Sequence, residues 1–454
     1  MIRRLGRALD RFFSAVTPDP LVLAVLLTLV TALLALALTS VTPGQVLEAW
    51  SGPRGLFGLL GFTMQMCLVL VTGHALAGSR LVKVGVDRLA VLPRTGAQAA
   101  ALVAGAAVLS SLLNWGLGLI VGALLAREVG RSTAARGIRA HYPLLAAAGY
   151  SGMMTWHGGL SGSAPLKVTT QKDLIELLGP ELGNQVAPIP LFETTFGGLN
   201  LWVTLGLLVW VPVVAYLLAP KGDEPVVLAD LPAESKVAPT TNPPTPNLPE
   251  RIFGHPGTML LLALPLLAAS IQYIEKNGIG SLDPNALNLF MLLLGLLLHG
   301  NLRAYARAVE GAVGGCAGIM LQFPLYAGIM GIMTGTGLAR VLAEWSAGAT
   351  APNLYVAQTF LGAALINMFI PSGGGQWAVQ GPIAVEAARI LGIPLSHAVM
   401  AVAYGDQWSN MLQPFWALPL LGITGVKAKD IIGYSATIML VSGVWILGVI
   451  WLWV

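Results

Sequence analysis

The chain is built from apolar stretches long enough to cross a lipid bilayer, and several of these stretches are interrupted by asparagine, glycine or proline. Apolar runs of about 20 residues, the length that a membrane-spanning helix needs, recur along the chain. Of its 454 residues, 55% are hydrophobic and only 10% are charged. Only helices and closed barrels satisfy their own backbone groups in lipid. The runs therefore predict an all-α polytopic membrane protein.

Most of the apolar stretches are predicted to span the membrane once. These stretches are 20–41, 55–79, 142–166, 198–218, 257–275, 284–300, 309–337, 397–422 and 431–454. The stretch 98–128 differs, because basic residues precede it (Arg80, Lys83, Arg88, Arg94) and follow it (Arg127, Arg131, Arg136, Arg139). Lysine and arginine favour cytoplasmic loops, so both of its ends are predicted to face the cytoplasm. It is therefore predicted to be a re-entrant helical hairpin, and the order of spans makes 353–390 a second one.

Two related halves are predicted. Residues 1–218 form the first half with hairpin 98–128, and residues 255–454 form the second half with hairpin 353–390, preceded by the extra span 257–275. The segment "GYSGMMTWHGGLSGSAPL" (149–166) resembles "AYGDQWSNMLQPFWALPL" (403–420), and Asn114 corresponds to Asn367. The predicted orientations are opposite, which gives an inverted-topology repeat of the kind found in secondary transporters. Residues 219–254, rich in proline and charge, are expected to form a cytoplasmic linker.

The interruptions at the two hairpin tips predict a binding site. A helix break in lipid persists only where protein, water or a ligand satisfies the freed backbone groups. Helix N-termini attract anions, and freed carbonyls can bind a small cation. The candidate substrate-binding residues are Ser110, Ser111, Asn114, Trp115, Gly116, His157, Asn367, Ser372, Gly373, Gly374, Gly375 and Gln376.

Two spans carry interruptions of their own, at "TWHGGLSGS" (155–163) and "YGDQWSNMLQP" (404–414). Asp406 is the clearest ionisable residue at membrane depth; it could bind a coupling cation, carry a proton, or have a structural role only. The residues expected to couple transport to a cation are Asp406, Ser409, Asn410, Thr155, Ser161 and Ser163. The coupling cation is expected to be Na⁺ or H⁺, with no cofactor and no other metal.

The groups gathered at the breaks are mostly neutral donors and aromatic rings. Neutral donors suit a small carboxylate, and an apolar wall for a short alkyl chain is predicted from Trp115, Trp156, Trp377, Trp408 and Trp416. Lys167, just after the first break, is expected either to reach the interface or to add positive potential to an anion path.

At these residues the chain resembles the bacterial short-chain fatty acid transporter family, within the larger ion-transporter superfamily. The matching strings are "SLLNWGLGLIVGALLARE", "YSGMMTWHGGLSGSAPL", "FIPSGGGQWAVQGP" and "YGDQWSNMLQPFWALPLLGI". The resemblance implies uptake of acids such as butyrate or acetoacetate, carboxylate binding at two hairpin tips, and a dimer that works by an elevator motion. Superfamily members often carry contiguous Ser-Asn-Thr at the tips, whereas this chain has Ser110, Ser111 and Asn114 at the first tip.

The main prediction is a secondary active transporter of short-chain monocarboxylates in the cytoplasmic (inner) membrane, with the N-terminus inside and the C-terminus outside. A transporter of C4-dicarboxylates or other small carboxylates is the closest alternative; an anion channel or a membrane enzyme ranks lower. The expected partners are the substrate, membrane lipid and a second copy of the chain. The net charge of +4 is assigned to loop arginines that set orientation, so nucleic acid is not expected.

Overall fold

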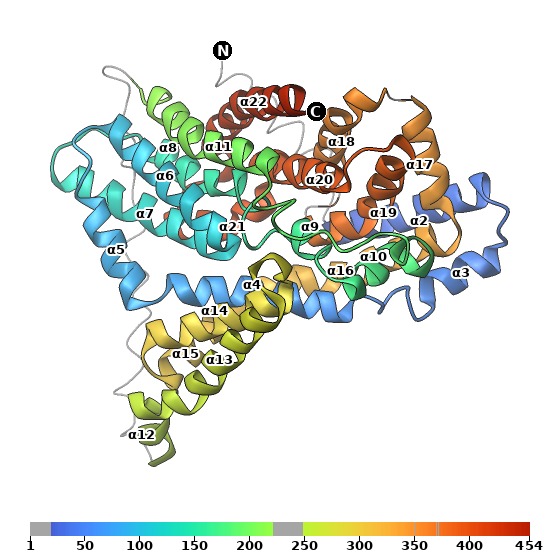
Figure 1. The fold of residues 1–454 in the computed structure, drawn as a ribbon. Coiled ribbons are helices and arrows are strands. Elements are labelled where there is room, and N and C mark those ends of the chain that lie inside the picture. The colour runs from blue at the N-terminus through green and yellow to red at the C-terminus, as the bar shows by residue number, and fades with distance from the viewer. Residues whose placement is uncertain (1–19, 221–247, 350, 369, 371) are drawn as a thin grey trace.

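Helices make up the regular structure throughout the described part of the chain (Figure 1). The computed structural model describes residues 20–220, 248–349, 351–368, 370 and 372–454. The first half contains α2 (Pro20–Leu38), α3 (Pro43–Ser51), α4 (Leu60–Ala77), α5 (Arg80–Ala90), α6 (Gly96–Leu113), α7 (Trp115–Ala135), α8 (Tyr142–Tyr150), η1 (Ser151–Met154), α9 (Ser163–Leu166), α10 (Gln171–Gly183) and α11 (Gly198–Leu217). The remainder contains α12 (Leu248–Gly254), α13 (Pro256–Asn277), η2 (Ile279–Ser281), α14 (Pro284–His299), α15 (Leu302–Val313), η3 (Gly314–Cys316), α16 (Ala317–Gly335), α17 (Leu338–Ala349), α18 (Pro352–Asn367), α19 (Gly373–Leu391), α20 (Leu395–Ser409), η4 (Asn410–Leu412), α21 (Pro414–Thr424) and α22 (Ala428–Trp453).

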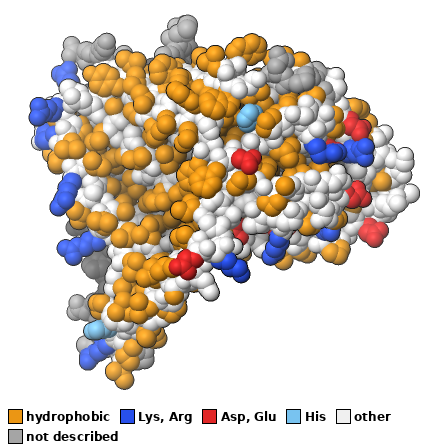
Figure 2. All heavy atoms as spheres, viewed as in Figure 1, with side chains coloured by type: hydrophobic (Ala, Val, Ile, Leu, Met, Phe, Trp, Pro, Cys, Tyr) orange, Lys and Arg blue, Asp and Glu red, His pale blue; other side chains and the backbone are white. Residues whose placement is uncertain are grey.

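Several helices have the length and composition of membrane spans. Within the described residues, 6 helical segments are long and apolar enough to cross a bilayer, among them α4, α11, α13 and α22. Large apolar side chains such as Leu33, Leu205 and Leu261 are exposed, as lipid-facing residues are. In Figure 2 hydrophobic side chains dominate the left part of the visible face, and charged side chains lie mainly along the left edge and over the right part. The prediction of an all-α polytopic membrane protein is confirmed.

Both predicted hairpins are pairs of helices joined at a short break. In the first, α6 ends at Leu113 and α7 begins at Trp115. Its open ends lie together, because the Arg136 guanidinium after α7 donates hydrogen bonds to the carbonyls of Val91 and Pro93 ahead of α6, both at 2.9 Å. In the second, the Tyr355 hydroxyl on α18 donates to the Ala384 carbonyl on α19 at 2.8 Å. Entry of these hairpins into the membrane from one side remains a prediction.

The interrupted spans are also present. The first continues from α8 through η1 into a turn and then into α9, and the second runs through α20, η4 and α21. The stretch 309–337 corresponds to the end of α15, η3 and α16. The remaining predicted spans are single helices: α2, α4, α11, α13, α14 and α22.

The order of elements repeats. A long helix, a short helix, a hairpin, a broken span and a final long helix occur in this order as α4, α5, α6–α7, α8–α9 and α11, and again as α16, α17, α18–α19, α20–α21 and α22. The first series has one additional helix, α10, before α11. The packing repeats as well, because α2 packs on α16 of the second half while α14 packs on α4 of the first. The inverted orientation of the halves stays a prediction.

Some helices were not expected from the sequence. They are α3, α5, α10, α12 and α17. Each of these helices is too short or too polar to be recognised as a membrane-spanning stretch, so a search for long apolar runs does not detect it. Within the expected linker 219–254, α12 begins at Leu248 and residues 221–247 lie outside the described residues, so the linker stays a prediction. Residues 1–19, at the N-terminus that is predicted to face the cytoplasm, also lie outside them.

Candidate functional site

The first hairpin tip is closed by its own asparagine. Asn114 is the N-cap of α7: its Oδ1 accepts a hydrogen bond from the Leu117 N–H at 2.9 Å, and its Nδ2 donates to the Val69 carbonyl of α4 at 3.0 Å. The Trp115 N–H donates to the Ser161 hydroxyl at 3.0 Å. A Cβ at Gly73 would lie 1.8 Å from Asn114 Oδ1, so only glycine admits this approach. Protein groups therefore satisfy most of this break.

The second tip presents the N-terminus of α19. The Ser372 hydroxyl caps it by accepting from the Gly375 N–H at 3.2 Å, and the Ser372 carbonyl accepts from the Gln376 N–H at 2.7 Å. The first amides of a helix have no partner within it, so the N–H groups of Gly373 and Gly374 are not bonded inside α19. Pro371, which the sequence motif also contains, lies outside the described residues.

The run of three glycines lets this tip pack closely against aromatic rings. A Cβ at Gly373 would lie 2.4 Å from Trp156, one at Gly374 would lie 2.9 Å from Phe62, and one at Gly375 would lie 2.5 Å from Tyr326. Any side chain here would push the tip away from α4, α16 and the first broken span.

Each broken span satisfies the backbone of the other. At the first break, the Gly158 N–H donates to Gln407 of α20 at 3.1 Å, and the Gly158 carbonyl accepts from Asn200 of α11 at 2.8 Å. At the second break, the Tyr150 hydroxyl of α8 contacts the carbonyls of Asn410 and Gln413 at 2.6 and 2.9 Å. The broken helices of the two halves thus depend on one another.

A buried histidine–aspartate pair connects the two breaks. His157 Nδ1 lies 2.7 Å from Asp406 Oδ2, and both side chains are completely buried. The Ala164 N–H donates to His157 Nε2 at 3.1 Å. Asp406 Oδ1 has no hydrogen-bond partner among the described residues.

Asn367 organises the second break. Its Nδ2 lies 2.7–2.9 Å from the Asp406 carbonyl, Ser409 Oγ and Asn410 Oδ1, and its own carbonyl accepts from Gln413 Nε2. Asn367, Asp406, Ser409 and Asn410, predicted in two different roles, therefore lie in one hydrogen-bonded cluster.

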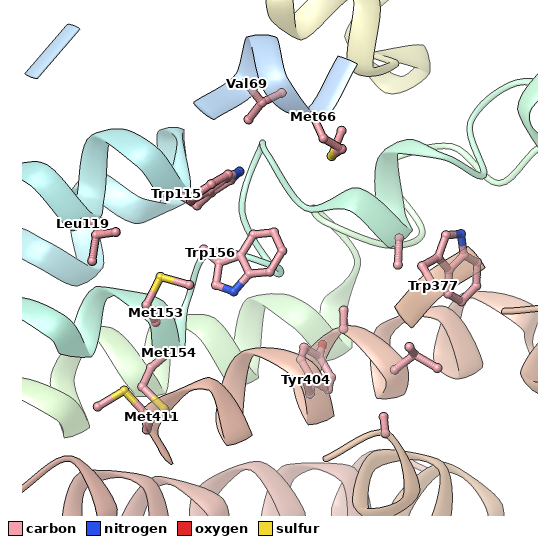
Figure 3. Packing of buried hydrophobic residues seen from close by; sticks show 14 of the residues in the cluster. Met66, Val69, Trp115, Leu119, Met153, Met154, Trp156, Trp377, Tyr404 and Met411 are labelled. Carbon is pink, nitrogen blue, oxygen red and sulfur yellow. The ribbon is translucent and has the colours of Figure 1, made fainter. Parts of the chain in front are cut away.

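A small cavity lies where the two tips and the two broken spans meet. It has a volume of about 20 Å³, room for about one water molecule. It is lined by Met66, Trp115, Met153, Trp156, Ser163, Ile319, Phe323, Ser372, Gly373, Gly374 and Trp416. Trp115 packs against Trp156 and Trp416, with ring centroids 6.2 and 5.2 Å apart. Figure 3 shows Trp115 and Trp156 side by side, with Met66 and Met153 on either side of them.

Several unpartnered polar atoms belong to residues at or near this cavity. Among the described residues, Trp156 Nε1 and Ser163 Oγ, which belong to two lining residues, have no hydrogen-bond partner. The same holds for Asn367 Oδ1 at the end of α18 and for Gln407 Nε2 and the Tyr404 hydroxyl on α20. Buried polar atoms without partners are costly and uncommon, so those beside the cavity make it a candidate ligand site.

The structure brings only some of the predicted substrate-binding residues to the cavity wall. Trp115, Ser372, Gly373 and Gly374 line it, as does Ser163, which was assigned to cation coupling. The others lie behind the wall. Ser110, Ser111, Asn114 and Gly116 belong to the closed first tip, Thr155 bonds the Val108 carbonyl, and Gln376 bonds Ala363 of α18. Gly375 packs on Tyr326, and Ser161 accepts from Trp115.

Sequence reasoning missed the α4 and α16 side of the wall. Met66, Ile319 and Phe323 come from unbroken helices, so no interruption of an apolar run marks them. Gln407 and Gln413 lie within the second break, "YGDQWSNMLQP" (404–414). Their polar amide groups in an otherwise apolar span were the feature that could have identified them.

Lys167 does not act as a free positive charge, and this expectation is wrong. The side chain is fully buried; its ammonium lies 2.5 Å from Asp173 and 2.8 Å from Glu176, and 4.7 Å from the centroid of the Phe62 ring. The two carboxylates on α10 neutralise it. Phe62 separates it from the second tip.

A larger cleft of about 910 Å³ opens at the far ends of α16 and α19. Its wall includes Gly331, Thr334, Pro382 and Glu386, and helices α3 and α10 close the other side. The Glu386 carboxylate pairs here with the Arg389 guanidinium at 2.7 Å. The described residues contain no group of three or more His, Cys, Asp or Glu that could hold a metal ion.

Comparisons with known proteins agree over the whole chain. A family model described as short chain fatty acid transporter matches residues 1–453. Two relatives are provisionally named as short-chain fatty acid transporters: one from Escherichia coli (strain K12) is 41% identical over 450 residues, covering 98% of each chain, and one from Haemophilus influenzae (strain ATCC 51907 / DSM 11121 / KW20 / Rd) is 38% identical over 460 residues, covering 100% of each.

A solved structure has a similar fold. The YdaH transporter of Alcanivorax borkumensis, described as having an unusual topology, aligns with a TM-score of 0.58 and 18% identity over 96% of this chain and 98% of that one. At this identity the likeness concerns the fold alone.

Proposed function

The chain belongs to the short-chain fatty acid transporter family, and on that premise we propose that it is a secondary active transporter of short-chain monocarboxylates such as butyrate and acetoacetate. It works in the cytoplasmic membrane, couples uptake to a cation gradient and alternates access to one central site. It performs no chemical conversion.

The observation that carries this proposal is the two-ended chemistry of the central cavity. The lining includes the start of α19, whose first amides have no partner within the helix, and it includes Ser163 and Trp156, whose hydroxyl and indole N–H have no partner among the described residues. The rest of the wall is aromatic or aliphatic, from Trp115, Phe323 and Ile319. A carboxylate bound to the donors places a short alkyl chain against the apolar wall.

A monocarboxylate fits this wall better than a dicarboxylate. A second carboxylate needs its own cation or donor cluster at depth, because an unpaired buried charge is very costly. No lysine or arginine lines the cavity among the described residues. The nearest candidate from sequence, Lys167, is already neutralised by Asp173 and Glu176.

The cavity must enlarge to hold a fatty acid, because about 20 Å³ holds about one water molecule. The hairpin tips meet there, so a movement of the hairpins with their broken spans opens it. An elevator-type movement of these elements against α2, α4, α14 and α16, in a homodimer, is the form of alternating access that we propose.

Uptake into liposomes tests the proposal. Purified protein is reconstituted, and exchange of ¹⁴C-butyrate against internal unlabelled butyrate is compared with exchange of ¹⁴C-succinate. Undissociated butyric acid crosses lipid unaided, so empty liposomes run in parallel. We expect saturable butyrate exchange above that background and none with succinate. Saturable succinate exchange without butyrate exchange would establish the dicarboxylate alternative, and non-saturable flux of both would indicate a channel.

A further inference from the structure

The protonation state of the buried pair can be read from its hydrogen bonds. His157 Nε2 accepts from the Ala164 N–H, so it carries no proton. A neutral imidazole has one proton, which then resides on Nδ1 and is donated to Asp406 Oδ2 over 2.7 Å. A further proton can enter this arrangement only at Asp406. The pair therefore has two charge states, negative with the Asp406 carboxylate and neutral with the carboxylic acid.

The pair lies directly behind the proposed substrate site. The His157 ring stacks on Trp156 of the cavity wall, with centroids 4.3 Å apart and planes at 20°. A Cβ at Gly373, another wall residue, would lie 3.0 Å from His157 Cε1. About one imidazole ring therefore separates Asp406 from a carboxylate bound at the start of α19.

Two carboxylates at this separation, away from water, repel one another. Substrate binding therefore favours protonated Asp406, and by thermodynamic reciprocity a protonated Asp406 favours substrate binding. This coupling needs only the Asp406 carboxyl group, the His157 imidazole and the substrate carboxylate.

Other titratable groups near α20 do not take the place of Asp406 as the site of protonation. His157 is the side chain seen to hydrogen-bond the carboxylate among the described residues. The titratable or charged groups on α20 itself and on the elements packed against it are His397, Tyr404, Tyr355, Glu386, Arg389, Lys429, Asp430 and Tyr434, with Lys167 following α9 and Tyr150 preceding η1. Tyr355, Tyr150 and Lys167 bond elsewhere, and Glu386 pairs with Arg389 at the cleft.

The oxygen atoms beside Asp406 are not arranged around an open position. The Asp406 carbonyl, Ser409 Oγ and Asn410 Oδ1 converge on the amide nitrogen of Asn367 at 2.7–2.9 Å. A nitrogen donor occupies the point that these oxygens surround.

From this geometry we propose that the coupling ion is a proton, carried on the Asp406 carboxyl group beside His157 and bound together with the substrate anion. The inference deepens the proposed function and rests on it. One carboxylate anion and one proton move together, so each transport cycle carries no net charge. No covalent bond changes.

Substrate-linked proton uptake by the wild-type protein tests this directly. Butyrate at a pH where it is fully ionised is added to detergent-solubilised protein in weak buffer with a pH dye. We expect uptake of about one proton per bound butyrate wherever Asp406 is ionised in the free protein, and a butyrate Kd that rises about tenfold per pH unit in that range. A Kd that is independent of pH across about pH 7 to 9, where butyrate stays ionised, overturns the proposal.

Variants reconstituted in proteoliposomes provide a second test of the proposal. Asp406→Asn imitates the neutral acid, so it should bind and exchange butyrate with no pH dependence but fail to accumulate it under an inward H⁺ gradient. Asp430→Asn, a change of an exposed carboxylate at the start of α22, should behave as wild type. Two results would contradict this inference but leave the proposed function intact. One is butyrate accumulation driven by Na⁺ but not by H⁺, and the other is H⁺-driven butyrate accumulation by Asp406→Asn. A wild-type protein that neither binds nor exchanges butyrate contradicts the proposed function and the inference together.

Discussion

At the residue scale, the Asn114 side chain closes the first hairpin tip, while the Ser163 hydroxyl beside the cavity has no partner among the described residues. Asn114 stood out because asparagine interrupts an apolar run, and it does lie at a hairpin tip. Its side chain is occupied by Leu117 and Val69, and Val69 lies 45 residues away on another helix. Such a partner cannot be read from the run itself. Ser163 was recognised, but the fact that its hydroxyl is free and faces the cavity depends on the folded chain.

Replacing Asn114 by alanine should destabilise the protein rather than alter substrate affinity. The change removes an N-cap and a buried amide-to-carbonyl bond, which together contribute about 1–3 kcal/mol. Thermal unfolding in detergent and the KM for butyrate exchange measure the two effects. Asn277→Ala, on the exposed end of α13, is the matched control and should be near neutral. A large rise in KM with an unchanged Tm would instead make Asn114 a substrate ligand.

Gly374→Ala should impair both packing and transport. Its Cβ would lie 2.9 Å from Phe62 and 3.1 Å from Phe323, so the second tip must shift or the rings must move, at about 1–3 kcal/mol. Gly362→Ala, where a Cβ meets nothing within 4 Å, is the control on the other arm of the same hairpin. Unfolding temperature and butyrate exchange rate are the measurements. Equal behaviour of the two variants would contradict the close packing of the tip.

At the element scale, spans and hairpins were predictable because their signals are local. Apolar length marks α11, α13 and α22, and glycine, serine and asparagine mark the breaks. The cross-connections between the broken spans were not predictable. Tyr150 and Gln407 reach carbonyl and amide groups more than two hundred residues away, and no local pattern encodes which tyrosine or glutamine does so.

The repeat-related tyrosines should respond differently to removal of their hydroxyl groups. Tyr150→Phe leaves the carbonyls of Asn410 and Gln413 without their donor and should cost about 1–3 kcal/mol. Tyr404, which corresponds to Tyr150 in the second half, has a buried hydroxyl with no described partner. Tyr404→Phe should therefore leave unfolding of the ligand-free protein unchanged or slightly shifted upward. A loss of stability in Tyr404→Phe equal to that in Tyr150→Phe would contradict this asymmetry.

At the scale of the whole molecule, α16 and α19 connect the central cavity to the large cleft. They pack side by side, with Phe323 and Gly374 at the cavity and Gly331 and Pro382 at the cleft. Eight residues separate the two sites on each helix, which is about 12 Å of α-helix. The sequence could predict two halves around a shared centre, but a cleft between α3, α10, α16 and α19 arises only when distant segments pack.

The cleft should be an access route to the cavity. In a background with Cys67 and Cys316 replaced by alanine, Thr334→Cys places a thiol on the cleft wall. A membrane-impermeant, bulky thiol reagent should abolish butyrate exchange by this variant. The same reagent at Leu47→Cys, an exposed position on α3 that does not line the cleft, should have no effect. Full exchange by labelled Thr334→Cys would place the route elsewhere.

The central claim is that the cavity between the hairpin tips binds the carboxylate, and the KM for butyrate exchange in a variant of its two free donors tests it most directly. Ser163→Ala combined with Trp156→Phe removes both donors and keeps an aromatic ring at position 156, although that ring is smaller. We predict a KM raised about tenfold or more with the unfolding temperature retained. Ser51→Ala with Trp451→Phe, both exposed, should match the wild type. A stable double variant with an unchanged KM would contradict the account.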